Sequence, residues 1–180
     1  ESQKTLMEGM GAIKVRSQGL MNFTQAYRKL TRIPNPVLQQ VKVKGFLNQI
    51  ETLFRPVVEK AGVKFSITAL EENSLLIDQD LMQQVIINLL KNALEAVEQQ
   101  SGSIDLIYSV NEEGQSVLEI RDNGKGIPEE IAEQIFIPFY TTKEDGSGIG
   151  LSLARQIIQL HGGSLHFKSN QESTIFIIKL

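Results

Sequence analysis

The sequence predicts an α+β fold: a two-layer α/β sandwich whose mixed sheet carries helices on one face, preceded by an N-terminal helix. Strand-like and helix-like segments mix from residue 41 to the C-terminus. Two successive strand-like segments, 104–110 and 116–121, are separated only by a short turn-forming stretch, which indicates a hairpin. A helix-like segment at the N-terminus is set apart from the rest by two closely spaced prolines.

The N-terminal segment, residues 1–31, is expected to be a helix. Its apolar side chains recur at spacings of three and four, at Leu6, Met10, Ile13, Leu20, Tyr27 and Leu30. This heptad-like stripe suits a helix–helix interface in a bundle or oligomer, and a helix packed on its own domain is the alternative. Pro34 and Pro36 stop the helix and make a stiff joint. We therefore expect a helix over 1–33, a linker over 34–40 and a domain over 41–180.

The first half of this domain is predicted element by element. Residues 41–43 are expected to be a short strand, and residues 46–61 a helix that is interrupted near Pro56 and closed by Gly62. Strands are expected over 63–70 and 75–78. Asp80 is expected to cap a long helix over 81–98.

The second half begins with strands over 104–110 and 116–121, joined through the turn 111–114. Residues 123–148 are expected to be mostly loop, with a short helix near 128–134. A helix over 151–160 is closed by the sequence His161-Gly162-Gly163, and strands over 164–168 and 174–180 complete the chain.

Composition excludes several classes of function. The 180 residues carry a net charge of −3, so no basic patch indicates a nucleic-acid partner. There is no cysteine, which excludes disulfides and thiol chemistry. No apolar run reaches the ~18 residues of a membrane span. The chain begins at Glu1 rather than Met, so we expect it to be a piece of a longer protein.

The helix expected over 81–98 carries a narrow polar stripe. At about 100° per residue, Gln84, Asn88, Lys91, Asn92 and Glu95 fall on one side. A solvent-exposed face is the simplest interpretation. However, asparagine has a low helix propensity, so two asparagines one turn apart lower the stability of the helix. Their amide oxygens suit a hard cation and their NH₂ groups suit phosphate, which favours Mg²⁺ already bound by a triphosphate.

Asp122 follows a strand and shares its parity with Leu118 and Ile120, so its carboxylate is expected to face the apolar side and to need a donor. A turn aspartate in an Asp-Asn-Gly hairpin is the alternative. The segment 125–128 does not resume an antiparallel strand, which weakens that alternative. An inward carboxylate beside glycines could accept a hydrogen bond from the exocyclic amine of a base.

Gly146, Gly148 and Gly150 stand immediately before a predicted helix. Backbone N–H groups at a helix start are unpaired and attract phosphate, although a flexible connector would have a similar composition. The spacing is neither a Rossmann fingerprint nor a Walker A loop. Residues 139–145 are expected to be a mobile lid, with Lys143 available to a phosphate.

Four segments, in order, resemble the motifs of sensor histidine kinases of two-component systems. Residues 88–93 resemble the N box, 122–128 the G1 box and 135–143 the F box. Residues 146–151, followed by His161-Gly162-Gly163, resemble the G2 box and its helix. The likeness covers about 41–180, and the N-terminal helix resembles the second helix of a dimerisation hairpin.

The resemblance implies a Bergerat ATP-binding fold of the GHKL type. It implies that Asp122 binds the adenine amine, that Thr174 supports it through water, and that Gly126 allows the base to approach closely. It also implies that Asn92 is the principal Mg²⁺ ligand, with Asn88 beside it. The other implied nucleotide-binding residues are Lys91, Gly124, Ile127, Tyr140, Thr142, Lys143, Ser147, Gly148, Ile149, Gly150 and Leu151.

The implied activity is transfer of the γ-phosphate of ATP to a histidine, for relay to the receiver domain of a response regulator. Asn88, Asn92 and Lys143 would position the phosphates and neutralise their charge. The implied parent protein is a homodimer that works on the cytoplasmic side of the inner membrane, anchored by segments outside this sequence.

The chain departs from the family pattern in two places. Glu95 stands where many of these kinases have a basic residue, and we assign it no role. The only histidines, His161 and His166, lack an acidic neighbour on a dimerising helix, so the acceptor is expected outside this chain. The chain is then expected to bind ATP and Mg²⁺ without phosphorylating itself.

Other functions fit the same motifs. They are an anti-sigma-factor serine kinase, a topoisomerase, mismatch-repair or chaperone ATPase, and a non-catalytic nucleotide-binding or dimerisation module. Hydrolysis is disfavoured because Asn88 stands where those ATPases are expected to carry a glutamate base, and an amide does not usefully accept a proton.

Overall fold

The computed structural model describes residues 2–143 and 146–180. Within the N-terminal helix the side chains of residues 2–9, 12, 14, 15, 22, 26 and 29 are not described. The side chain of Leu6 in the predicted apolar stripe, and residues 144 and 145 of the predicted lid, therefore lie outside the described residues.

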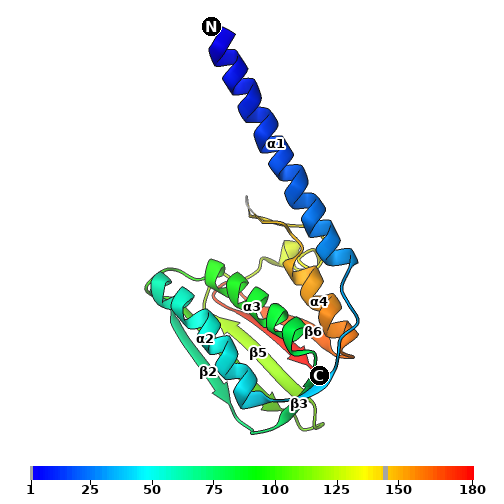
Figure 1. Ribbon diagram of the computed structural model, residues 1–180. Coiled ribbons are helices and arrows are strands. Elements are labelled where there is room, and N and C mark those ends of the chain that lie inside the picture. Colours follow the sequence, from blue (N-terminus) through cyan, green and yellow to red (C-terminus); the bar gives the residue numbers. More distant parts are fainter. Residues whose placement is uncertain (1, 144–145) are drawn as a thin grey trace.

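A five-stranded mixed sheet forms one layer of the main body (Figure 1). Its strands stand in the order β2 (Lys64–Ala69), β4 (Ser103–Val110), β5 (Ser116–Asp122), β7 (Thr174–Lys179) and β6 (Ser164–Ser169). The β2–β4 pair is parallel and the other pairs are antiparallel. The prediction of an α+β sandwich with a mixed sheet is confirmed.

Three helices form the second layer and cover one face of the sheet (Figure 1). They are α2 (Val43–Ala61), α3 (Gln79–Ala96) and α4 (Gly150–Leu160), and a short 3₁₀ turn, η1, spans Glu129–Ile131. The strands β1 (Gln39–Lys42) and β3 (Ser74–Ile77) pair only with each other, as a separate antiparallel two-stranded sheet.

The core lies between these layers. Alternate residues of the strands point to the helices, because side chains of a strand alternate between faces. The fully buried members include Phe46, Ile50, Phe54, Ile86, Leu89, Leu90, Leu106, Tyr108, Leu118, Ile120, Ile158 and Ile178.

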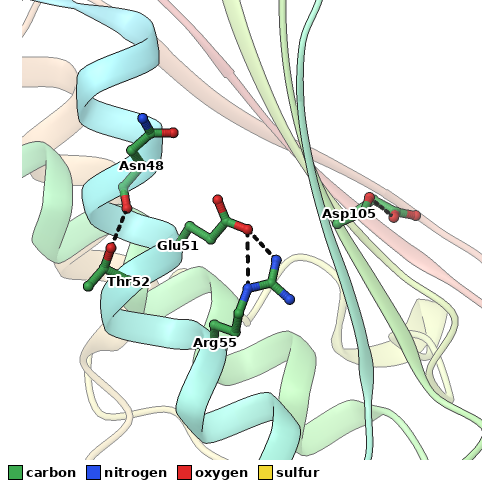
Figure 2. Close-up of polar contacts among 6 residues, drawn as sticks. Asn48, Glu51, Thr52, Arg55 and Asp105 are labelled. Atoms are coloured by element: carbon green, nitrogen blue, oxygen red, sulfur yellow. Dashed lines mark hydrogen bonds and ion pairs between the residues drawn. The ribbon is translucent and has the colours of Figure 1, made fainter.

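The helix α2 is continuous, so the predicted interruption at Pro56 is wrong. Phe54 and Val58 are buried on either side of Pro56, which is itself exposed. Packing of the apolar face therefore offsets the hydrogen bond that proline cannot make. Figure 2 shows Arg55 of α2 paired with Glu51 one turn earlier. The Arg55 guanidinium also lies 5.9 Å from the ring centroid of Phe65 on β2.

The helix α3 begins two residues before the predicted start, because Asp78 is its N-cap and Asp80 is not. The Asp78 carboxylate accepts a hydrogen bond from the backbone N–H of Leu81 at 3.1 Å and a second from Val37 at 2.9 Å. These hydrogen bonds lower the pKa of Asp78 below its usual value. The helix ends at Ala96, and Val97 already has an extended backbone.

The helix α1 (Ser2–Thr31) matches the helix predicted over 1–31 and extends away from the main body (Figure 1). Its C-terminal half contacts the body where the ring of Phe23 lies 5.0 Å from that of Phe139. Leu30 and Ile33 pack against the core. Within the described part of the chain, no helix has the length and apolar character needed to cross a membrane.

Candidate functional site

A cleft runs between α3 and the loop that joins β5 to α4. It consists of two cavities of about 640 and 590 Å³. Both cavities are lined by Asn92, Glu95, Ile131, Ile135, Thr142, Lys143 and Leu151, so they are two ends of one space. We call them the carboxylate end, which contains Asp122, and the amide end, which contains Asn88.

Asp122 lies at the bottom of the carboxylate end and is only 5% exposed. Its inward orientation follows the predicted strand parity, since Leu118 and Ile120 are buried beside it. The carboxylate accepts a hydrogen bond from the backbone N–H of Gly124 at 3.0 Å. Burial in this low-polarity position raises the pKa of Asp122 to about 6.

The other walls of the carboxylate end are mostly apolar. They include Ala96, Ile127, Pro128, Ile131, Ile135, Leu151 and Phe176, with Thr174 opposite Asp122 in the sheet register. An apolar slot with one deep acceptor suits a flat heterocycle that carries an amine. The Thr174 hydroxyl lies 3.1 Å from that of Ser169.

Backbone packing accounts for the glycines at this end. A Cβ on Gly126, where φ is +68°, would lie 1.6 Å from the carbonyl oxygen of Asn170. A Cβ on Gly124 would lie 2.5 Å from the carbonyl oxygen of Ala96. Contacts within the protein therefore exclude a side chain at Gly124 and at Gly126, whether or not a ligand is bound. The close approach of a base at Gly126 stays a prediction.

The amide end is lined by Asn88, Lys91 and Asn92 of α3, as the polar stripe predicts. The Asn88 Nδ2 atom is buried and has no hydrogen-bond partner within the described residues. A Cβ on Gly150, the first residue of α4, would lie 2.5 Å from Asn88 Oδ1. An unpaired buried amide donor that faces a helix N-terminus fits a phosphate ligand.

The residues of the amide end suit Mg²⁺ only if phosphate supplies further ligands to the ion. In the described ranges, no group of three or more His, Cys, Asp or Glu side chains could hold a metal ion. The Asn92 Oδ1 atom is a neutral oxygen donor, and Asn92 lines both cavities. Mg²⁺ usually takes few protein ligands and completes its shell with phosphate oxygens and water. The donor set thus suits an ion that enters with a nucleotide.

Described residues of the predicted lid line the amide end. Tyr140, Thr142 and Lys143 line the amide end together with Ser147 and Gly148. The Phe139 N–H donates to the carbonyl oxygen of Gly148 at 2.9 Å, and Gly148 has a φ of +65°. The Lys143 ammonium forms an ion pair with Glu95 and donates to Asn92 Oδ1 at 3.2 Å. Ile149, the N-cap of α4, is buried and borders a smaller neighbouring cavity.

Some lining residues escaped the sequence analysis. Ile131 lies where a short helix was expected near 128–134 and Ile135 begins the segment that resembles the F box, but neither was named as a site residue. Phe176 shares strand parity with Thr174 and could have been found from it. Ser169 is not among the lining residues, but its hydroxyl accepts a hydrogen bond from the N–H of the lining residue Ile127 at 2.8 Å.

Neither histidine lines the cleft. The His161 Nε2 atom accepts a hydrogen bond from the N–H of Asp78 at 3.0 Å, and Nδ1 lies 2.8 Å from the Ile157 carbonyl oxygen. His161 therefore joins the end of α4 to the start of α3. His166 is exposed on β6.

The family model, the related sequences and the similar structures all include histidine kinases. Residues 77–180 match the model described as "Histidine kinase-, DNA gyrase B-, and HSP90-like ATPase". Sporulation kinase A of Bacillus subtilis is 36% identical over 140 residues, which are 77% of this chain and 23% of that protein. The chain thus spans about a quarter of that relative's length.

Two solved structures are similar along most of the chain. The catalytic domain of histidine kinase ThkA has a TM-score of 0.72 at 30% identity, over 79% of this chain and 94% of that one. Histidine kinase ThkA in complex with response regulator protein TrrA has a TM-score of 0.76 at 25% identity, over 98% of this chain and 51% of that one.

Proposed function

The chain belongs to the family of histidine kinase-, DNA gyrase B- and HSP90-like ATPases, and we propose that it is the catalytic part of a sensor histidine kinase that transfers the γ-phosphate of ATP to a histidine outside these 180 residues. The observation that carries this proposal is the continuous cleft with a buried carboxylate at one end and an asparagine pair at the other.

Each end of the cleft has a proposed role. Asp122 accepts a hydrogen bond from the adenine amine, and Thr174 supports it. Asn88, Lys91 and the N–H groups at the start of α4 contact the phosphates. Asn92 is the protein ligand of Mg²⁺, which when bound neutralises phosphate charge.

The remaining predicted residues surround these groups. Gly124, Gly126 and Ile127 shape the carboxylate end. The lid and the start of α4 enclose the phosphates through Tyr140, Thr142, Lys143, Ser147, Gly148, Ile149, Gly150 and Leu151.

The phosphate acceptor is a histidine elsewhere in the parent protein. His161 is unsuited to this role because both of its ring nitrogens have partners. The proposed final recipient is the receiver domain of a response regulator, which the complex of histidine kinase ThkA with its response regulator supports. The parent protein is proposed to be a homodimer through α1, whose exposed apolar side chains include Met10, Ile13 and Leu20.

Calorimetric titration with ADP and Mg²⁺ tests the binding site. We expect one site per chain, and Asp122→Asn should weaken binding by ten- to a hundredfold, about the value of a hydrogen bond to a charged group. Asp105→Asn is the control, because Asp105 lies on β4 outside the cleft. Asn92→Ala should remove the dependence of ADP affinity on Mg²⁺.

Phosphoryl transfer is tested with ATP labelled at the γ-phosphate. The 180-residue chain alone should take up no label, whereas a histidine-bearing helical hairpin of the parent protein, added in trans, should become labelled. Label on the chain itself, or steady ATP hydrolysis without an acceptor, would contradict the proposal.

A further inference from the structure

Glu95 is an acidic residue of the cleft to which the proposed function gives no role. It lies in the last turn of α3, one turn after Asn92. It lines both ends of the cleft. A carboxylate on the wall of a phosphate site repels the ligand at short range unless a cation neutralises it.

The structure supplies that cation from the lid. The Lys143 ammonium forms an ion pair with the Glu95 carboxylate and also donates to Asn92 Oδ1 at 3.2 Å. We call this three-residue arrangement the lid contact. Lys143 lies 48 residues after Glu95 in sequence, so the contact joins the lid to α3 across the cleft.

Hydrogen bonds join the backbone of Lys143 to Thr141 and Gly146. The Lys143 N–H donates to the Thr141 hydroxyl at 3.1 Å, and the Gly146 N–H donates to the Lys143 carbonyl oxygen at 3.3 Å. A Cβ on Gly146 would lie 2.4 Å from that hydroxyl oxygen. These contacts tie the backbone of Lys143 to Thr141 and Gly146.

We propose that Glu95 is a positioning residue that keeps Lys143 on Asn92 when no nucleotide is bound, so that Mg²⁺–nucleotide must break the lid contact to bind. The inference rests on the proposed function, because the competing ligand is the nucleotide of that site. The Lys143 ammonium is hydrogen-bonded to Asn92 Oδ1, which is the oxygen atom proposed to bind Mg²⁺. The same ammonium, once released, is available to a phosphate.

The lid contact is suited to being broken. The side chains of Lys143 and Glu95 are 46% and 54% exposed. An ion pair this open to water is weak and screened by salt. It can therefore hold the lid in the nucleotide-free protein and still yield to a triphosphate, which carries several negative charges.

The first test measures affinity for ADP and Mg²⁺ by calorimetry. Glu95→Gln should tighten binding about two- to fivefold, the range expected from losing one exposed ion pair. In a Lys143→Gln background the same substitution should give a clearly smaller gain, because only direct repulsion between the Glu95 carboxylate and phosphate is left to remove. An equal gain in that background would mean that Glu95 simply repels phosphate. Weaker binding by Glu95→Gln in the otherwise wild-type chain would mean that Glu95 helps to bind the metal ion. Either result overturns the proposal. Glu98→Gln, an equal charge change outside the cleft, is the control.

The second test needs no nucleotide. Amide hydrogen exchange over residues 139–148 should be faster in Glu95→Gln than in the wild type, and adding ~0.5 M salt should speed exchange in the wild type only. Equal exchange in the two proteins would overturn the proposal.

The two proposals can fail separately. If the wild-type chain does not bind ADP and Mg²⁺, the proposed function fails. If it binds, and Asp122→Asn weakens binding as expected while Glu95→Gln changes neither affinity nor exchange, only the lid contact fails.

Discussion

At the scale of single residues, Asp122 is a group whose burial suits nucleotide binding but lowers the stability of the folded chain. Its carboxylate is buried and accepts backbone hydrogen bonds from Gly124 and Thr174. Burial raises its pKa to about 6, so the ionised form is disfavoured in the folded chain. A nucleotide amine would supply a further donor to that ionised form. The residue is thus better suited to the bound state than to the free one.

The pH dependence of stability follows from this shift. A raised pKa means that the folded chain binds the proton more tightly than the unfolded chain does. The resulting stabilisation is present below about pH 4 and is lost as the pH rises through about 6. Asp122→Asn, which keeps an acceptor without the charge, should therefore melt higher than the wild type without nucleotide, and this advantage should grow between pH 4 and 7.

Thermal melting of both proteins across this pH range is the measurement. Asp105→Asn, on the face of the sheet away from the cleft, is the control and should show a smaller change. A melting difference that stays constant from pH 4 to pH 7 would show that the Asp122 carboxylate does not titrate in this range.

Two glycines in helices allow a matched comparison. A Cβ on Gly45 of α2 would have no atom within 4 Å beyond its own stretch of helix, whereas a Cβ on Gly150 would lie 2.5 Å from Asn88 Oδ1. Gly45→Ala should raise the free energy of unfolding by about 0.5–1 kcal/mol. Gly150→Ala should show no such increase and should weaken ADP binding, because the new methyl group would displace the Asn88 side chain. Urea denaturation and calorimetry measure the two effects, and equal behaviour of both variants would contradict the role of Asn88.

At the scale of elements, the start of α3 depends on one side chain. Asp78 accepts hydrogen bonds from Leu81 in the helix and from Val37 in the preceding segment, and its own N–H donates to His161. This one residue joins three separate parts of the chain. The position of α3 sets the positions of Asn88 and Asn92.

Capping by Asp78 predicts a specific loss of stability. Asp78→Ala should cost about 1–2 kcal/mol of unfolding free energy, whereas Asp80→Ala should cost only the ~0.3–1 kcal/mol of a charge near a helix start. Because the pKa of Asp78 is lowered on folding, its contribution is present above about pH 4 and is lost as the pH falls below that value. Urea denaturation at pH 7 and pH 3 checks both statements, and an equal loss in the two variants would contradict capping by Asp78.

At the scale of the whole molecule, α1 and the sandwich are proposed to be separate units. The side chains that line the cleft all follow residue 87, and the buried core begins at Val41. A chain of residues 33–180 should therefore unfold cooperatively and bind ADP with Mg²⁺ within about twofold of the longer chain. Melting and calorimetry test this, and loss of either property would make α1 part of the domain.

Much of this architecture was predictable because it depends on local patterns. Strand parity placed Asp122 inside, and helical spacing placed Asn88, Lys91 and Asn92 on one stripe. The interruption at Pro56 and the cap at Asp80 were wrong because tertiary contacts decided both. Phe54 and Val58 pack on either side of the proline, and Val37 and His161 both contact Asp78.

The sequence by itself therefore determined the fold class, the family and the residue types at each end of the cleft, since periodicity and motif order are local properties of the chain. Only the tertiary structure decided that the two ends form one space, that Gly150 abuts Asn88, and that Glu95 pairs with Lys143. Those last two contacts join residues 48 or more positions apart in the chain. No local pattern specifies such distances, because they depend on how helices and sheet pack together.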